Sequence, residues 1–221
     1  MNGLPMETST ASKGLFLTFE GSEGCGKSTQ IRLLAEALRS RGQDPLLVRE
    51  PGGTPSGEVI RHLLQHAPEG AALTAESELL LFAASRAQLV REVIRPALLA
   101  GRTVISDRFF DSTTVYQGVA RKIPPEVTAR INAFAVGVCL PDLTFLIDLD
   151  RATALERMGG RNRDPDRIER ESEDFFEAVR CGYLELAARE KHRVHVLEGA
   201  RPAEEIAAQI RTHLASAGFL S

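Results

Sequence analysis

A glycine-rich segment that follows a short apolar run constrains the fold of this chain most strongly. Residues 21–28 read GSEGCGKS and fit the pattern GxxxxGK[ST], directly after the run LFLTF at residues 15–19. Residues 28–40 then carry apolar side chains at helical spacing. Between a strand and a helix, glycines let backbone N–H groups surround phosphates, and the helix N-terminus adds positive potential. The segment is therefore predicted to be a phosphate-binding P-loop rather than a glycine-rich turn with a surface lysine.

The predicted P-loop assigns nucleotide and metal contacts to a short stretch of chain. Lys27 is expected to reach the β- and γ-phosphates of ATP, and the Ser28 hydroxyl to ligate Mg²⁺. Asp107 follows a predicted strand, and its carboxylate suits the neighbourhood of Mg²⁺. Asp148 shows a similar pattern, so the P-loop is what favours Asp107. The residues expected to bind the nucleotide are Gly21, Ser22, Glu23, Gly24, Cys25, Gly26, Lys27, Ser28 and Thr29.

Five short apolar runs alternate with segments of helical periodicity along the chain. Thr74 is expected to cap the third helix and Pro96 to kink or end it. The alternation predicts an α/β fold, a P-loop NTPase three-layer sandwich whose five-stranded, mainly parallel sheet is covered by helices on both faces. Strands are predicted at residues 15–19, 45–48, 103–106, 144–147 and 194–197, and helices at about 28–40, 58–65, 75–93, 125–138, 152–158, 171–190 and 203–214.

The chain reads as a single domain over residues 14–221, preceded by a loose polar tail at 1–13 that lacks the pattern of a targeting signal. Residues 157–167 interrupt the pattern with four arginines, two glycines and a proline between two helices. A purely structural connection of this kind is usually shorter. We therefore expect a mobile basic flap, or lid, at about residues 157–170.

Composition excludes several classes of protein. The 221 residues are 43% hydrophobic and 26% charged, which does not fit a disordered chain, a collagen or a coiled coil. The net charge of −3 is too near neutral for a non-specific nucleic-acid binder, and the apolar runs are too short to span a membrane. Three widely spaced cysteines without a CxxC motif indicate reduced thiols in the cytoplasm.

Other motifs narrow the type of P-loop protein. The chain has no NKxD and no DxxG, so the base-reading and switch motifs of a GTPase are missing. A motor ATPase would normally be larger. A small domain with a basic flap suits phosphoryl transfer between two small molecules, because such a reaction must exclude water.

Several segments together make the chain resemble the bacterial thymidylate kinases, from about Leu15 to the C-terminus. The resemblance implies phosphorylation of dTMP to dTDP with ATP and Mg²⁺, small-molecule partners only (no nucleic acid and no membrane), and a homodimer. The segments that carry it are FEGSEGCGKST at 19–29, REPGGT at 49–54, LFAASRAQ at 81–88, DRF at 107–109, and Ser112, Thr113 and YQG at 116–118.

Under this resemblance, two side chains one helical turn apart read the thymine base. Phe82 and Arg86 are separated by four residues and project from one helix face. A phenyl ring can stack on a pyrimidine while a guanidinium donates to a carbonyl oxygen. Taken alone, Phe82 among leucines would be a core residue. The resemblance also implies that Thr113 hydrogen-bonds the base, and Gln117 belongs to the same substrate-binding segment.

The resemblance further implies contacts to the sugar and phosphate of dTMP. Arg108 is expected on the monophosphate, with Arg61 as a second contact, because a guanidinium matches phosphate oxygens bidentately. Tyr116 is expected to pack on the deoxyribose and to crowd a 2′-hydroxyl. Glu23 is expected at the 3′-hydroxyl. Glu50 either approaches Mg²⁺ through water or is a turn carboxylate before a proline.

The family has two designs, with a catalytic arginine in the P-loop or in the lid. Residues 22–25 contain no basic side chain here, so the lid design fits. Arg161 and Arg163 lie beside a Gly-Gly pair and are the expected catalytic arginines, whereas Arg157 and Arg167 would order the flap or contact ATP. The sequence VLEGA at 196–200 departs from the turn expected near adenine. Another nucleoside monophosphate kinase and a non-catalytic ATP-binding switch remain alternatives.

Overall fold

A computed structural model describes residues 14–159 and 165–220. The tail predicted at residues 1–13 and the proposed catalytic arginines Arg161 and Arg163 lie outside the described residues.

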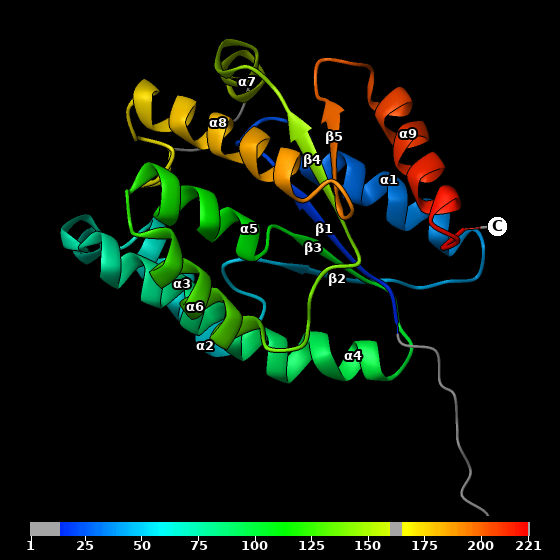
Figure 1. Ribbon diagram of the computed structural model, residues 1–221, viewed down its shortest axis with the longest axis horizontal. Helices are drawn as coiled ribbons and strands as arrows, with labels where there is room; N and C mark the ends of the chain where they lie inside the picture. Colours follow the sequence, from blue (N-terminus) through cyan, green and yellow to red (C-terminus); the bar gives the residue numbers. More distant parts are fainter. Residues whose placement is uncertain (1–13, 160–164, 221) are drawn as a thin grey trace, which may run out of the picture.

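A five-stranded sheet forms the centre of the molecule (Figure 1). Its strand order is β2-β3-β1-β4-β5, and every pairing is parallel. The prediction of a mainly parallel sheet is therefore confirmed, and in the described residues the sheet is wholly parallel. Each predicted strand lies within one or two residues of an observed one. The strands are β1 (Phe16–Glu20), β2 (Leu46–Arg49), β3 (Val104–Asp107), β4 (Leu143–Asp148) and β5 (Val194–Glu198).

Helices follow the strands, and several begin at side-chain caps. The Thr54, Thr74, Asp150 and Ser172 side chains each accept a bond from a backbone N–H in the first turn of a helix. The helical elements are α1 (Lys27–Arg39), α2 (Pro55–Gln65), the 3₁₀ helix η1 (Pro68–Ala72), α3 (Ala75–Leu89), the π-helix η2 (Val90–Ile94), α4 (Arg95–Leu99), α5 (Phe110–Thr113), the π-helix η3 (Thr114–Ala120), α6 (Pro125–Val136), α7 (Arg151–Met158), α8 (Glu173–Arg189) and α9 (Ala203–Ser216).

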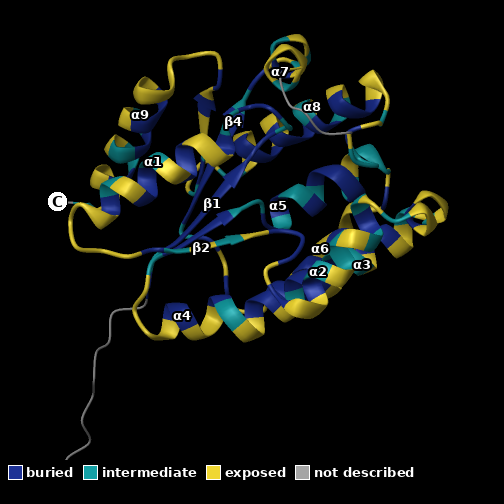
Figure 2. Cartoon of the chain, turned by 180° about the vertical axis from the view of Figure 1, so that it is seen from behind, coloured by how far each residue is buried: buried dark blue, intermediate teal, exposed yellow. Residues whose placement is uncertain are grey.

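Two helical layers enclose the sheet. Helices α1 and α9 lie side by side on one face and pack against the sheet through a shared apolar cluster. The other face is covered by α3, α4, α6 and, farther along, by η3 and α8. Figure 2 shows the strands mostly buried, with exposed residues on the outer helix faces. Burial on both faces explains why β1 and β4 read as continuous apolar runs.

The long helix predicted at residues 75–93 departs from α-helical geometry after Leu89, not at Pro96 as expected. The α-helix ends at Leu89, one π-helical segment follows, and α4 continues through Pro96 to Leu99. Pro96 therefore does not end the helical run. It lies in the first turn of α4, where a missing N–H and a fixed φ are tolerated.

Sequence reasoning missed the helical segment over residues 110–120. This segment contains β-branched Thr113, Thr114 and Val115, together with Gly118, all of which disfavour a helix. Tertiary packing compensates, because Val115 and Tyr116 are buried in a cluster with α8. The π-helical form of η3 fits the frequent occurrence of such segments at functional sites.

Candidate active site

The P-loop between β1 and α1 requires glycine for steric reasons. Gly21 has φ +133°, and a Cβ there would lie 2.4 Å from the Ile147 carbonyl oxygen. Gly26, with φ +108°, directly precedes α1. Lys27 is the first residue of that helix, and its Nζ donates to the carbonyls of Gly21 at 3.1 Å and Ser22 at 2.8 Å. The loop thus folds around the lysine ammonium.

Lys27 is buried but stays positively charged. Burial and Arg108 lower the pKa of its ammonium, yet Cys25, Glu23 and Asp107 outweigh them and raise the pKa above its ordinary value. A buried cation beside backbone N–H groups is suited to binding the anionic end of a nucleotide.

A cavity of about 650 Å³ opens at the carboxyl ends of the strands, where parallel α/β sheets bind ligands. Its walls contain most of the predicted site residues. Gly21 and Ser22 lie outside the lining and support it through Lys27. The predicted residues that line the cavity are Glu23, Gly24, Cys25, Gly26, Lys27, Ser28, Thr29, Glu50, Arg61, Phe82, Asp107, Arg108, Thr113, Tyr116 and Gln117.

Two oxygen ligands suited to a divalent cation meet on the cavity wall. The Ser28 hydroxyl donates to a carboxylate oxygen of Asp107 at 3.2 Å. Asp148 instead accepts two bonds from Arg180, at 2.7 and 2.8 Å. The geometry therefore supports Asp107, not Asp148, beside the P-loop, and a hydroxyl with a carboxylate is a donor set that fits Mg²⁺.

Arg108 joins the P-loop to the opposite wall of the cavity. Its guanidinium donates to Glu23 at 2.7 Å and to Ser112 at 3.1 Å, and it lies 5.2 Å from the centroid of the Tyr116 ring. Its backbone has φ +68°, a conformation that non-glycine residues rarely adopt. The turn after β3 is therefore held in an unusual form that directs this guanidinium into the cavity.

Glu20, at the end of β1, holds this turn in place. One carboxylate oxygen accepts the backbone N–H of Phe109 at 2.8 Å and that of Ser112 at 3.3 Å. The other accepts the Ser112 hydroxyl at 2.6 Å and the Tyr183 hydroxyl at 2.8 Å. Tyr183, on α8, also accepts a bond from Arg108 at 3.3 Å. Sequence reasoning missed both Glu20 and Tyr183. The available signal for Glu20 was a charged residue directly after a predicted apolar strand.

Phe82, Thr113 and Gln117 lie on the wall predicted to bind the base. Phe82 is half-buried and lines the cavity, so it is not simply a core residue. The Thr113 hydroxyl oxygen is buried and has no hydrogen-bond partner within the part of the chain that the structure describes. A ligand could satisfy this group.

Arg86 lies behind this wall rather than on it. It is 1% exposed, and its guanidinium donates to Glu50 at 2.7 Å, Asn132 at 3.2 Å and the Phe109 carbonyl at 3.3 Å. Its partner Glu50 lines the cavity, and the second carboxylate oxygen of Glu50 is buried without a partner among the described residues. Arg61, by contrast, lines the cavity and donates to the Pro51 carbonyl at 2.9 Å.

Two of the four flap arginines lie at the ends of the flap and donate hydrogen bonds to residues outside it. Arg157 lines the cavity and donates to the Gly199 carbonyl at 3.0 Å. Arg167 donates to the Leu64 carbonyl at 2.8 Å and to the Glu78 carboxylate. Whether these arginines order the flap or contact ATP stays a prediction. The phosphate-binding loop between β1 and α1 faces a second polar wall of the cavity, around Arg108. This arrangement is that of a P-loop nucleotide-binding protein.

Thymidylate kinases of several bacteria are similar to this chain over most of its length. The thymidylate kinase family profile matches residues 19–210. A thymidylate kinase of Desulfovibrio desulfuricans is 47% identical over 204 residues, which cover 90% of this chain and 94% of that protein. One of Geobacter sulfurreducens is 48% identical over 192 residues, covering 84% and 89%. The crystal structure of thymidylate kinase from Ehrlichia chaffeensis matches with a TM-score of 0.73 and 33% identity, over 92% of this chain and 99% of that chain. The chain therefore belongs to the thymidylate kinase family.

The buried Glu50 generates a prediction about pH. Burial raises the pKa of its carboxyl from 4.5 to about 7, against the opposing effect of Arg86. The folded state thus binds a proton more tightly than the unfolded state, so wild-type stability should fall as pH rises through this range. Relative to Glu50→Gln, which cannot titrate, wild type should lose about 1–3 kcal/mol of unfolding free energy between pH 4.5 and 7.

Urea denaturation at several pH values measures this difference. Leaving Arg86 without a carboxylate lowers the unfolding free energy of Glu50→Gln by an amount that does not depend on pH. The change with pH of the difference between wild type and Glu50→Gln therefore reports the titration of Glu50. The control is Glu58→Gln, which removes a solvent-accessible carboxylate paired with Arg49. Its difference from wild type should be small, because an exposed ion pair contributes little to stability. Parallel curves for wild type and Glu50→Gln would contradict the assignment.

Proposed function

We propose that this chain transfers the γ-phosphoryl group of ATP to dTMP, giving dTDP and ADP, with Mg²⁺ as cofactor. Family membership supports the reaction, and one structural observation carries it: a P-loop and a second polar subsite share one cavity. The Glu23–Arg108 ion pair joins them at 2.7 Å. A donor and an acceptor phosphate held in this cavity would face each other.

The mechanism needs positioning and positive charge more than a base. A phosphate monoester is largely ionised at neutral pH, so no residue must remove a proton from the acceptor. Lys27 and the backbone N–H groups of the P-loop would hold the ATP phosphates, and Arg108 and Arg61 would hold the acceptor phosphate. Ser28 and Asp107 would hold Mg²⁺, which neutralises phosphate charge when bound.

The acceptor subsite would recognise thymidylate through its base and sugar. Phe82 would stack on the thymine, Thr113 and Gln117 would hydrogen-bond its edge, and Tyr116 would pack on the deoxyribose near Glu23 at the 3′-hydroxyl. Arg86 stays a proposed base contact, because it lies one turn from Phe82 and its partner Glu50 lines the cavity.

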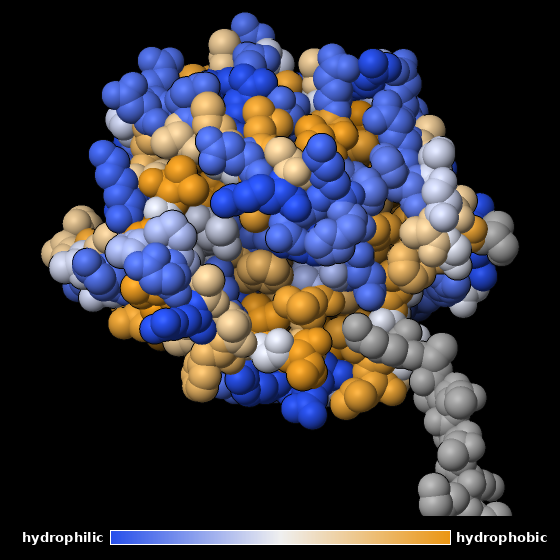
Figure 3. Space-filling model, viewed as in Figure 1, coloured by the Kyte–Doolittle hydropathy of each residue, from blue (hydrophilic) through white to orange (hydrophobic). Residues whose placement is uncertain are grey.

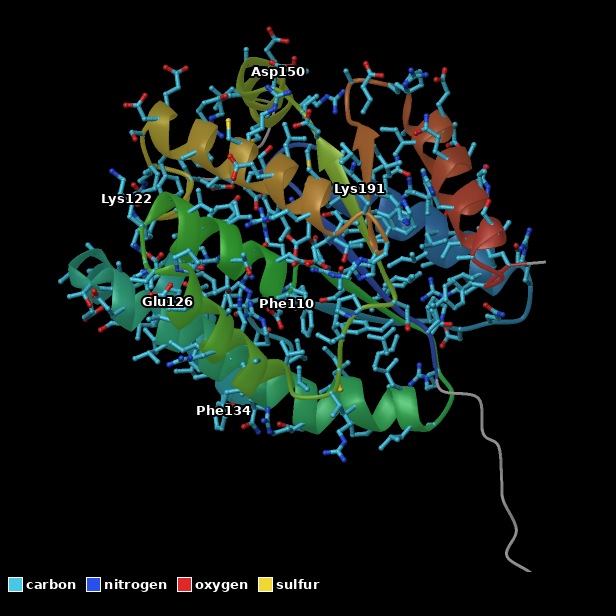
Figure 4. All side chains as sticks on the ribbon, viewed as in Figure 1. Phe110, Lys122, Glu126, Phe134, Asp150 and Lys191 are labelled. Carbon is cyan, nitrogen blue, oxygen red and sulfur yellow. The ribbon has the colours of Figure 1, made fainter. Side chains whose placement is uncertain are left out.

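We also propose a homodimer. Apolar side chains are exposed on and after α6, which packs against α3: Phe134 and Val138 are each 78% exposed and Leu80 is 56% exposed. Figure 4 shows Phe134 pointing away from the body of the protein, and Figure 3 shows apolar residues gathered over the neighbouring part of that face. A second copy of the chain would cover such a surface.

We infer a cytoplasmic location from the thiols. The chain has three widely spaced cysteines and no CxxC motif, as is usual in a reducing compartment. Across the described residues, no helix combines the length and apolar character that a bilayer crossing demands.

The P-loop lysine gives the first test of this function. Lys27→Ala should lower dTMP-dependent ADP release by about 10²–10³-fold or more, because it removes charge stabilisation from the phosphates. The melting temperature should change little, since the hydrogen bonds of Lys27 to described residues go to two loop carbonyls and the Cys25 thiol. The matched control is Lys191→Ala, an exposed lysine in the turn between α8 and β5 (Figure 4).

The same ADP-release assay is run with dTMP, dUMP, AMP, dGMP or thymidine as the acceptor, and once without an acceptor. Fastest turnover with dTMP supports the proposal. Turnover that does not depend on an acceptor would favour an ATP-binding switch, and preference for a purine monophosphate would favour another nucleotide kinase. A folded Lys27→Ala variant with near wild-type activity would overturn the P-loop assignment.

The flap gives a second test. No residue at 22–25 is basic, so the interior of the P-loop places no cationic side chain beside the migrating phosphoryl group. We propose that Arg161 and Arg163 supply the positive charge that stabilises this group. An arginine in this role is worth about 10³–10⁵ in kcat in related systems. Arg161→Ala or Arg163→Ala should therefore lower kcat by orders of magnitude with little change in the KM for dTMP. The exposed Arg170, changed to Ala, serves as control. Losses of no more than a few-fold in every variant would refute the lid-arginine mechanism.

A further inference from the structure

Glu78, on α3, is a buried carboxylate outside the cavity lining. It is 1% exposed and receives three side chains from other elements. Gln117 of η3 donates its amide Nε2–H to Oε1 at 2.8 Å. Arg121 donates to both carboxylate oxygens at 3.2 Å. Arg167 donates to Oε2 and is itself fixed by the Leu64 carbonyl.

The two arginines keep Glu78 ionised. Burial alone would raise the pKa of its carboxyl, but the hydrogen bonds and charge of Arg121, with Gln117 and Arg167, outweigh burial and lower the pKa. An ionised carboxylate can only accept hydrogen bonds. It therefore fixes the orientation of the Gln117 amide, whose oxygen and nitrogen would otherwise be interchangeable in shape. The amide nitrogen must face Glu78, so the amide oxygen faces away from it.

Gln117 lines the cavity on the same wall as Phe82 and Thr113. No side chain or backbone group that the structure describes donates to its Oε1. This oxygen can only accept, so a ligand group that bonds to it must be a donor. On the pairing edge of thymine or uracil, N3–H is the single donor and stands between two carbonyl oxygens. In cytosine, N3 carries a lone pair instead, which an acceptor oxygen repels.

We propose that Glu78 is a specificity-determining positioning residue: by holding the Gln117 amide in one orientation, it makes the acceptor subsite select pyrimidines that carry an N3–H over cytosine. The inference rests on the proposed placement of the acceptor base beside Phe82, Thr113 and Gln117. Glu78 touches no substrate and acts only through Gln117.

The first variant is Glu78→Gln, which keeps the shape but can both donate and accept. The Gln117 amide is then free to turn its nitrogen toward the base. The ratio of kcat/KM for dTMP to that for dCMP should fall at least about tenfold, the scale of one lost and one unsatisfied hydrogen bond. The KM for ATP should stay within about twofold, because Glu78 lies outside the P-loop.

Glu78→Asp guards against a folding defect. It keeps a negative charge for Arg121 and Arg167 but is one methylene too short to hold Gln117 at 2.8 Å. The same fall in the dTMP-to-dCMP ratio is expected. The matched control is Glu171→Gln, which removes the other carboxylate that pairs with Arg121 and leaves the Glu78 carboxylate and its bond to Gln117 intact. This variant should lower the melting temperature yet keep the ratio within about twofold of wild type.

Gln117→Leu separates failure of this inference from failure of the proposed site. If Gln117→Leu leaves the ratio unchanged, the base does not lie beside Gln117 and the placement itself is wrong. If Gln117→Leu lowers the ratio but Glu78→Gln and Glu78→Asp do not, the placement stands and the role of Glu78 is overturned. An equal fall in Glu171→Gln would show that general loosening, not amide orientation, changes the base preference.

Discussion

The hydrogen bonds of one buried carboxylate connect the parts of the site that come from distant segments. Glu20 ends the central strand β1, immediately before the P-loop, and both its oxygens accept two hydrogen bonds. Burial and the nearby Asp111 raise the pKa of its carboxyl, against the opposing effects of Arg108, Ser112 and Tyr183. Its donors lie in the turn after β3 and on α8. The strand that carries the phosphate loop therefore also fixes the turn that carries Arg108.

Parallel topology makes this connection possible. Strands β1 and β3 are neighbours and end at the same edge of the sheet, with Phe19 opposite Asp107. The loops that follow them therefore face each other across the cavity. Glu23 from one loop and Arg108 from the other pair at this edge. A reaction between two anionic phosphates needs such a constraint, because their charges must be neutralised while their positions are fixed.

The sequence predicted the sheet, most helices and the P-loop because these depend on local patterns. Apolar runs, helical spacing and the glycines of residues 21–28 each act over a few residues. The helical segment at 110–120 was missed because contacts with α8, rather than propensity, stabilise it. The roles of Glu20 and Glu78 were missed for a related reason: Glu20 bonds to Tyr183, 163 residues away, and Glu78 to Arg167, 89 residues away. No short motif encodes such pairs.

Arg86 shows a different limit of sequence reasoning. Its helical spacing from Phe82 predicts that both side chains project from one face of α3, but spacing does not reveal which one reaches the cavity surface. The Glu50 carboxylate binds Arg86 at 2.7 Å and draws it behind the wall. A buried arginine requires such a partner, yet the sequence offers 30 acidic residues from which to choose it. Only the fold identifies the pair.

Binding calorimetry on Glu20→Gln tests the central claim, that Glu20 positions the acceptor arginine, most directly. A neutral amide of the same shape can no longer accept all four hydrogen bonds, so the turn that holds Arg108 should loosen. Glu20→Gln should therefore bind dTMP at least about tenfold more weakly, with ATP affinity within about twofold of wild type. Tyr183→Phe, which removes one of the four donors, should give a smaller loss in the same direction. Unchanged dTMP affinity, or equal losses for dTMP and ATP, would contradict the account.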